Sequence, residues 1–294
     1  KLKAINKKLI FGTANLSKPY GINSQKIQNH NSIKNIIEFL KKEKINFVDT
    51  AYSYGSAVKD LGKNRIQKFN IISKLPNLQS TNFKLLEEEI YKTTFEMIYN
   101  LRIKKLYGLL IHNTNNLNGA KGIKIYNVLK KLKKEGFLKK IGYSIYSTKE
   151  LDKFCFKFPP DVIQGPLNLF DQTIVSSGWL GKLKKKKIEF HSRSIFLQGL
   201  LLKKKGKLPR KFNKFNQIFK NYHAFLKKSK LEAFEACLLF VCSIKLINRI
   251  VIGIDNLSQL KKIVNFKNKT GNYNFKKLEC KKESLINPTK WNYL

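Results

Sequence analysis

The sequence predicts one α/β domain built as a closed (β/α)8 TIM barrel. Eight short runs rich in β-branched and aromatic residues are separated by longer segments with apolar residues at every third or fourth position. This alternation is typical of a parallel sheet with helical crossovers, and eight such units in roughly 250 residues fit a closed barrel better than an open sheet. No G-x-G-x-x-G follows the first run, which counts against a doubly wound dinucleotide-binding sheet. No linker divides the 294 residues, so residues 1–294 are expected to form one domain.

The eight expected strands are short apolar runs, several of which stop at a polar residue or a glycine. They are residues 8–13, 45–49, 69–74, 106–112, 139–144, 161–164, 187–192 and 249–253. Between them, helical spacing is clearest in four segments. Asn31 and Ser32 are expected to cap the first, and the others span about 84–101, 123–134 and 212–246.

The net charge of +40 comes from 59 basic and 19 acidic residues, and such an excess ordinarily suggests a nucleic acid or an anionic membrane as partner. Only five of the basic residues are Arg, however, and proteins that read nucleic acids use the arginine fork as well as lysine. The charge is also spread along the chain. We therefore expect no specific nucleic-acid partner, and we interpret the lysine runs at 182–187 and 203–205 as solvated faces.

The cysteines and the hydropathy pattern indicate a reducing compartment and no membrane association. Cys155, Cys237, Cys242 and Cys280 form no C-x-x-C pair and have no His at ligand spacing, so they are expected to be reduced core thiols and not metal ligands. No apolar run approaches the roughly 18 residues of a membrane span. The first residues also lack the pattern of a signal peptide, and we expect a cytoplasmic protein.

Polar residues stand where the expected strands end. They are Asp49, Tyr52 and Tyr54 after the second strand, Lys74 at the third, His112 and Asn113 at the fourth, Ser144 at the fifth, Gln164 at the sixth and Arg193 at the seventh. Barrel chemistry is found at the carboxyl ends of the strands, so these side chains are expected to converge on one mouth.

Four of these side chains have complementary chemistry. Tyr54 alone is a poor acid, with a pKa of about 10, but a nearby Lys74 ammonium favours its anion and lowers that pKa. Asp49 can hold Lys74 charged and oriented, and His112 can offer an N–H to a carbonyl oxygen. Together they can polarise a C=O group and give it a proton, which carbonyl reduction requires when a hydride arrives at carbon.

Three of the same segments, "DTAYSYG", "ISKLP" and "LLIHN", resemble the catalytic blocks of the aldo-keto reductase family. The similarity extends over nearly the whole chain through "LIFGTANLSKPYGIN", "IGYSIYSTKEL", "IQGPLNLFDQ", "HSRSIFLQGLLL" and "VIGIDNLSQLKKIV". The stretch "SRSIFLQGLLL" resembles a bacterial branch found among surface-sugar biosynthesis enzymes. The resemblance implies a (β/α)8 barrel that usually takes NADPH and reduces a small-molecule aldehyde or ketone.

The resemblance also implies a role for each strand-end residue. Tyr54 matches the proton donor, Lys74 and Asp49 the pair that tunes its pKa, and His112 the residue that orients the substrate. Ser144 and Gln164 match the groups that hydrogen-bond the nicotinamide carboxamide. Ile145 replaces an Asn that often contributes there, and Arg193 replaces a stacking aromatic that its planar guanidinium can imitate.

The adenosine end of the cofactor is expected near Gly253, Asp255, Asn256 and Gln259. Gln259 and Ile263 stand where NADP-selective members carry Arg and Asn, while Lys261 and Lys262 can supply charge for a 2′-phosphate. These residues are compatible with either nucleotide. NADPH is the expected cofactor and NADH the alternative.

The resulting hypothesis is an oxidoreductase that uses NAD(P)H, and its alternative is a regulatory or binding subunit that keeps the cofactor site without turnover. The intact set of Asp49, Tyr54, Lys74 and His112 favours the enzyme. His30, His191 and His223 are expected to be structural or surface residues, and Trp179 and Trp291 either line the pocket or pack in the core. The sequence predicts neither the particular substrate nor the oligomeric state.

Overall fold

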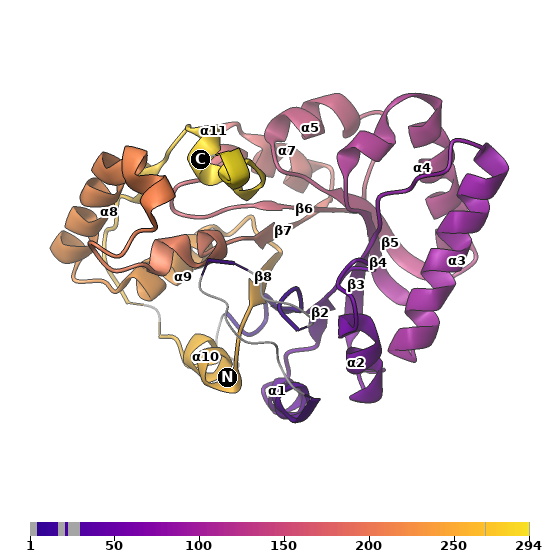
Figure 1. The fold of residues 1–294 in the computed structure, drawn as a ribbon, viewed down its shortest axis with the longest axis horizontal. Coiled ribbons are helices and arrows are strands. Elements are labelled where there is room, and N and C mark those ends of the chain that lie inside the picture. Colours follow the sequence, from indigo (N-terminus) through magenta and orange to yellow (C-terminus); the bar gives the residue numbers. More distant parts are fainter. Residues whose placement is uncertain (1–4, 17–20, 23–29, 268, 294) are drawn as a thin grey trace.

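The computed structural model describes residues 5–16, 21–22, 30–267 and 269–293, and in them eight parallel strands close into one barrel (Figure 1). The strands are β1 (Leu9–Gly12), β2 (Phe47–Asp49), β3 (Asn70–Leu75), β4 (Leu106–Ile111), β5 (Leu138–Ser144), β6 (Val162–Pro166), β7 (Glu189–Arg193) and β8 (Arg249–Gly253). Each strand pairs with the next along the chain, and β8 pairs with β1 to close the ring. The predicted barrel is confirmed, with every expected strand in its place.

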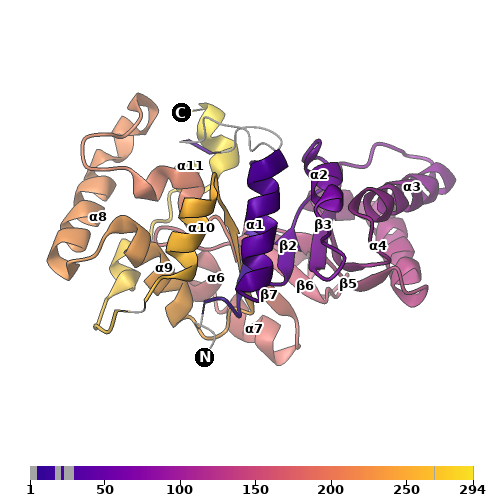
Figure 2. The ribbon, with the colours of Figure 1, turned by 90° about the horizontal axis from the view of Figure 1, so that it is seen from below.

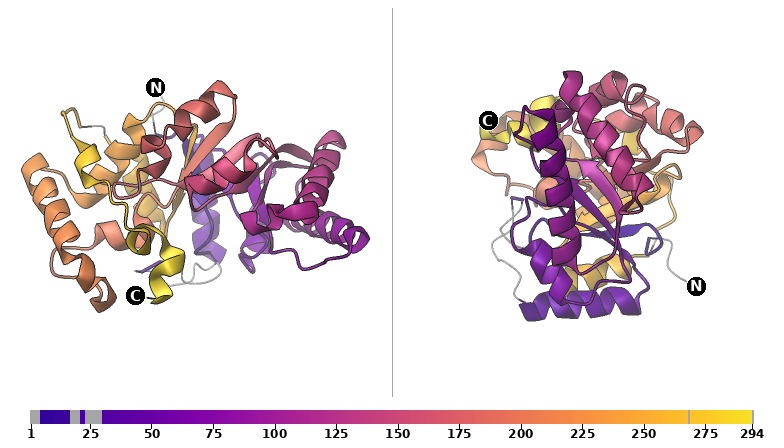
Figure 3. Two further views of the ribbon diagram at one scale, coloured as in Figure 1. Left: turned by 90° about the horizontal axis from the view of Figure 1, so that it is seen from above. Right: turned by 90° about the vertical axis from the view of Figure 1, so that its right-hand side faces the viewer.

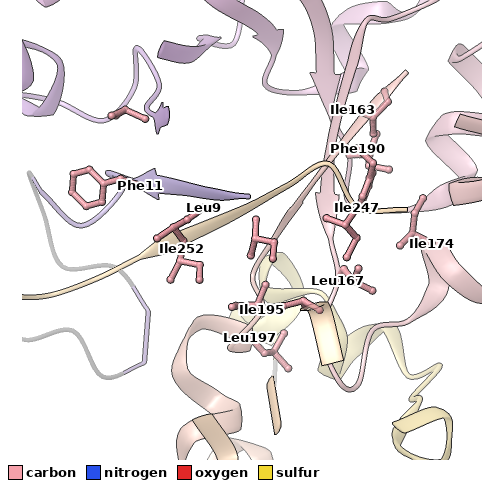
Figure 4. Close-up of a cluster of buried hydrophobic side chains, with 14 of the residues drawn as sticks. Leu9, Phe11, Ile163, Leu167, Ile174, Phe190, Ile195, Leu197, Ile247 and Ile252 are labelled. Atoms are coloured by element: carbon pink, nitrogen blue, oxygen red, sulfur yellow. The ribbon is translucent and has the colours of Figure 1, made fainter. Parts of the chain in front are cut away.

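Alternation along the strands separates two apolar layers. Ile10, Phe47 and Ile72 belong to a buried cluster that also includes Leu110, Val162 and Val251. Neighbours on the same strands, such as Leu9 and Phe11, belong to the larger cluster between the sheet and the helices (Figure 4). Successive strand residues point to opposite faces, so one run of apolar residues supplies both layers. The side chains fill the barrel interior, and ligands therefore reach the barrel at its ends.

Helices surround the barrel (Figures 1 and 3). They are α1 (His30–Lys42), α2 (Ala57–Lys63), α3 (Phe83–Leu101), α4 (Gly119–Lys134), α5 (Thr148–Phe154), α6 (Thr173–Ser176), α7 (Trp179–Lys185), α8 (Asn216–Ser229), α9 (Ala233–Ser243), α10 (Leu257–Val264) and α11 (Glu283–Ile286). α10 packs beside α1, although the two are far apart in the sequence (Figure 2). α3 and α4 lie at one end of the molecule and α8 at the other.

Two of the expected helix boundaries are wrong. Asn31 and Ser32 lie within α1 and do not precede it, because the helix already includes His30. The expected helical region 212–246 is divided into a 3-10 segment, Arg210–Phe215, followed by α8 and α9. α8 ends at Ser229, and its C-cap Lys230 has a left-handed φ of 51°. The chain turns there before a capping box between Glu232 and Glu235 begins α9.

The short helices α2, α5, α7 and α10 were not expected from periodicity, because seven or eight residues give too few turns to show it. For α5, however, the sequence contains a helix-start signal. The Ser147 side chain accepts from a backbone N–H of α5 while the Glu150 side chain accepts from the backbone N–H of Ser147, which is a capping box.

All four cysteines are free, as expected, and Cys155, Cys237 and Cys280 are buried. Cys242 is half-buried, and burial raises the pKa of its thiol to about 11, so it stays protonated at neutral pH. No helix within the described part of the chain is both long and apolar enough to cross a bilayer.

Gly142 in β5 lies so close to β6 that a side chain does not fit. A Cβ at this position would lie 1.8 Å from the carbonyl oxygen of Val162. We expect Gly142→Ala to lower the free energy of unfolding by about 3 kcal/mol, because the strands must separate to admit the methyl group. Urea denaturation checks this. Gly181→Ala in α7 is the matched control, since a Cβ there meets nothing within 4 Å; equal stability of the two variants would contradict the prediction.

Candidate active site

The barrel brings four polar side chains to the carboxyl ends of three neighbouring strands. Asp49 is the last residue of β2, Lys74 lies one residue before the end of β3, and His112 directly follows β4. Tyr54 stands in the loop after β2, where its backbone N–H donates to the carbonyl of Ala51. The predicted convergence of these residues is present in the fold.

Asp49 and Lys74 form a buried ion pair. The ammonium of Lys74 lies 2.6 Å from Oδ2 of Asp49 and donates a second hydrogen bond, of 3.0 Å, to the carbonyl of Thr50. The two side chains are 5% and 3% exposed. Burial lowers the pKa of Lys74, and the Asp49 carboxylate opposes that effect, so the lysine and its counter-ion form one buried pair.

Tyr54 faces this charge. The Nζ of Lys74 lies 5.4 Å from the centroid of the Tyr54 ring, and the ring is half-buried. The Lys74 ammonium thus links the Asp49 carboxylate to the Tyr54 ring.

His112 completes the group. Its ring lies edge-on to Tyr54, with centroids 6.3 Å apart and planes at 78°. Burial, together with the positive charges of Lys74 and Arg193, lowers the pKa of His112 to about 4. The imidazole is therefore neutral at neutral pH and keeps an N–H that can donate to a substrate oxygen.

Gln164 and Ser144 are register partners on β6 and β5, and both are buried. The amide nitrogen Nε2 of Gln164 donates to Oδ1 of Asp49 at 2.7 Å. Asp49 therefore uses one oxygen for Lys74 and the other for Gln164, a contact that the sequence did not indicate. Gln164 lines the large cavity described below, whereas Ser144 lies behind its wall.

Arg193, at the end of β7, is fixed by its own surroundings. Its guanidinium lies 4.5 Å from the centroid of the Tyr146 ring, and Nη2 donates to the carbonyl of Ile145 at 2.8 Å. Ile145, which replaces the expected Asn, thus helps to hold Arg193 through its backbone carbonyl oxygen. Tyr146 covers one face of the planar guanidinium, and Arg193 also lines the cavity. No pattern in the sequence predicts this contact of Tyr146 with Arg193.

A cavity of about 860 Å³ opens beside these residues and extends to α10. Asp49 and Tyr54 line it, whereas Lys74 and His112 lie outside its lining. At the other end Gly253, Asp255 and Gln259 contribute to the wall. Gln259 Nε2 donates to Asp255 Oδ2 at 3.1 Å, and Gln259 Oε1 accepts from the Asp255 N–H at 2.8 Å. Asn256 is the N-cap of α10, accepting from the Gln259 N–H, and lies outside the lining.

Several residues that line the cavity differ from the sequence-based expectation. The run Lys203–Lys205 was interpreted as a solvated face, but all three lysines line the cavity, since the loop after β7 folds back over it. Asn15 also lines the cavity and is buried; its amide nitrogen donates to Ile254 and Asp255, while Oδ1 has no partner among the described residues.

Of the remaining aromatic and imidazole side chains, His223 joins the cavity wall, although a structural or surface role was expected. Trp179 and Trp291 are buried in the core, outside the cavity lining. His191 is fully buried away from this site, in keeping with a structural role. The side chain of His30 lies outside the described residues.

A buried Lys–Asp pair beside a phenol at the carboxyl end of a (β/α)8 barrel defines a barrel oxidoreductase that acts on carbonyl groups. The chain belongs to the aldo/keto reductase family, whose model matches residues 8–279. This family assignment confirms the resemblance read from the catalytic blocks and makes the chain a carbonyl-reducing oxidoreductase with a small-molecule substrate.

Solved structures share the fold at low sequence identity. The aldo-keto reductase AKR11C1 from Bacillus halodurans, in its holo form, is 16% identical with a TM-score of 0.74, covering 92% of this chain and 91% of that one. The glycerol dehydrogenase AKR11B4 from Gluconobacter oxydans is 19% identical with a TM-score of 0.69, covering 92% and 89%. The curated proteins include no match to the chain.

Proposed function

We propose that the protein reduces an aldehyde or ketone to an alcohol with a nicotinamide dinucleotide, and that Tyr54 is the proton donor. The observation that carries the proposal is the Lys74 ammonium, which bonds Asp49 at 2.6 Å and faces the Tyr54 ring at 5.4 Å. A buried cation next to a phenol serves no obvious packing purpose, because burying it is costly. We infer that its purpose is to favour proton transfer from Tyr54.

The residues of the cavity fit a dinucleotide. Its volume of about 860 Å³ is at the upper end of the range for small-molecule sites. Lys203, Lys204, Lys205 and Lys262 line it and can neutralise phosphates. Among the described residues the buried Oδ1 of Asn15 has no partner, and it suits a hydroxyl donor such as that of a ribose.

A bound reduced nicotinamide supplies a hydride to the substrate carbon. The residues of the chain orient the carbonyl oxygen and transfer a proton to it. His112, neutral at neutral pH, donates an N–H to the carbonyl oxygen and orients it. Tyr54 transfers its proton to the same oxygen as negative charge develops there, and Lys74 stabilises the phenolate that remains. Gln164 and Arg193, in the cavity wall, are positioned to hold the nicotinamide end.

NADPH is the cofactor that we propose, and Lys262 is the residue expected to meet its 2′-phosphate. Calorimetric titration should show NADPH binding about tenfold more tightly than NADH, the effect of one charge-assisted contact. Lys262→Gln should remove that difference. Lys261→Gln is the matched control, because Lys261 is the neighbouring exposed residue of α10 and does not line the cavity. Equal affinities in the wild type would contradict the preference.

Turnover separates this proposal from that of a non-catalytic binding subunit on the same barrel. A panel of aldehydes and ketoses, including sugar derivatives, is offered with NADPH and with NADH while the nicotinamide absorbance is followed. Loss of absorbance with a member of the panel supports the reductase. Cofactor binding without any turnover across the panel would favour the binding subunit.

A further inference from the structure

A second cavity, of about 470 Å³, lies at the opposite end of the barrel, among the amino ends of the strands. It lies far from the proposed reaction because the strands are parallel and their carboxyl ends carry Asp49 and Lys74. The lining comes from segments that are distant in the sequence, from before β1 to the first residue of β8. The fold therefore assembles this cavity and no single lysine-rich run creates it.

Four cations line this cavity: Lys7, Lys44, Lys139 and Arg249. No carboxylate lines it, and within the described ranges none of the four takes part in a salt bridge. Like charges that face one another without a counter-ion repel, and this repulsion is relieved when an anion binds between them.

The guanidinium of Arg249 is fixed in place at the floor of this cavity. Its Cζ lies 3.6 Å from the centroid of the Phe47 ring, and Nη1 donates to the carbonyl of Lys7 at 2.7 Å. Phe47 in turn packs edge-on against Tyr107 at 4.9 Å between centroids. A stacked guanidinium loses little freedom when it binds an oxyanion, and its planar fork suits phosphate oxygens.

Within the described part of the chain, two carboxylates contact residues of the cavity lining, and the first, Glu43, accepts from the Asn6 side chain at 3.5 Å. The second, Glu189, is already occupied. It accepts from Lys140 at 2.6 Å and from the Tyr107 hydroxyl at 3.0 Å, and it lies 3.0 Å from Nε2 of the buried His191. Three partners use the oxygens of Glu189, and among the described residues neither carboxylate forms a salt bridge with any of the four cavity cations.

We propose that this cavity binds a multivalent phosphate anion, with Arg249 at its floor and Lys44 and Lys139 at its rim. Asn46 and Asn70, which also line the cavity, add amide donors for the remaining oxygens. Several cations converge on the cavity, and the planar Arg249 guanidinium suits phosphate oxygens. The space is larger than one phosphate group, so we infer a ligand with more than one.

Calorimetric titration with inorganic diphosphate tests the proposal on the intact protein. We expect a saturable site in the wild type and at least about tenfold weaker binding at that site in the double variant Lys44→Gln, Lys139→Gln, which removes two charge-assisted contacts. Both lysines are exposed, so the fold is expected to survive. The control, Lys220→Gln with Lys228→Gln on α8, removes the same charge from exposed positions outside this cavity and should bind within about twofold of the wild type.

A second titration, with NADPH present in excess, distinguishes this cavity from the larger one. The diphosphate site should remain in its presence. Loss of the site under NADPH, equal weakening in the two double variants, or the absence of saturable binding would each overturn the proposal. Because the first titration requires no cofactor, its result stands whether or not the proposed reductase activity is found.

Discussion

Tyr54→Phe is expected to lower kcat by at least about 100-fold, the size of a general-acid effect. The change removes the hydroxyl of the ring whose centroid lies 5.4 Å from the Lys74 ammonium, while it keeps the ring itself beside His112. Cofactor affinity should stay near that of the wild type, since the aromatic ring remains in the cavity wall. Steady-state kinetics with the best substrate of the panel, together with calorimetry of the cofactor, give both quantities.

Tyr52→Phe is the matched control for this prediction. Tyr52 stands two residues away in the same loop, but it is exposed and its hydroxyl donates to Glu96 at 2.7 Å. Its loss should leave turnover within about twofold, as expected for a surface hydrogen bond. If both variants turned over like the wild type, Tyr54 would not be the proton donor. If both lost activity equally, the loop and not the phenol would be responsible.

Lys74→Met is expected to reduce both activity and stability. It removes the cation that we propose to assist proton transfer from Tyr54, and turnover should fall by about 100-fold or more. It also leaves the buried Asp49 carboxylate without its partner, which should lower the free energy of unfolding by about 3–5 kcal/mol. Urea denaturation and steady-state kinetics measure the two effects on one preparation.

The double variant Asp49→Asn, Lys74→Met separates these effects. It removes both charges at once, so the unpaired carboxylate disappears and most of the lost stability should return. Activity should not return, because no cation then faces Tyr54. Recovery of turnover together with stability would show that the pair serves the fold alone and would contradict its proposed part in proton transfer.

The strands and the centre of the site were predictable from the sequence because they depend on local patterns. Apolar runs such as those of β4 and β8 bury both faces, and a parallel barrel places everything that follows such a run at one mouth. Asp49, Lys74 and His112 could therefore be brought together without coordinates. The family blocks then supplied the expected role of each.

The remainder of the site depends on contacts between distant segments, which periodicity does not encode. Arg193 rests on Tyr146, and Gln164 reaches Asp49 across the barrel. In the sequence, Lys203–Lys205 does not differ from the other lysine runs. Only the fold shows that these lysines line the cavity. The turn at Lys230 was hidden because a left-handed lysine has no sequence signature comparable to that of glycine.

The contact between Gln164 and Asp49 has a consequence for the acid itself. The amide nitrogen of Gln164 has a second N–H, and its carbonyl oxygen is a further acceptor, so a molecule seated against Gln164 pulls on the same group that steadies the carboxylate. Asp49 in turn accepts from the Lys74 ammonium, which lies 5.4 Å from the centroid of the Tyr54 ring. We therefore expect a ligand bound at Gln164 to affect the orientation of the Asp49–Lys74 pair beside Tyr54.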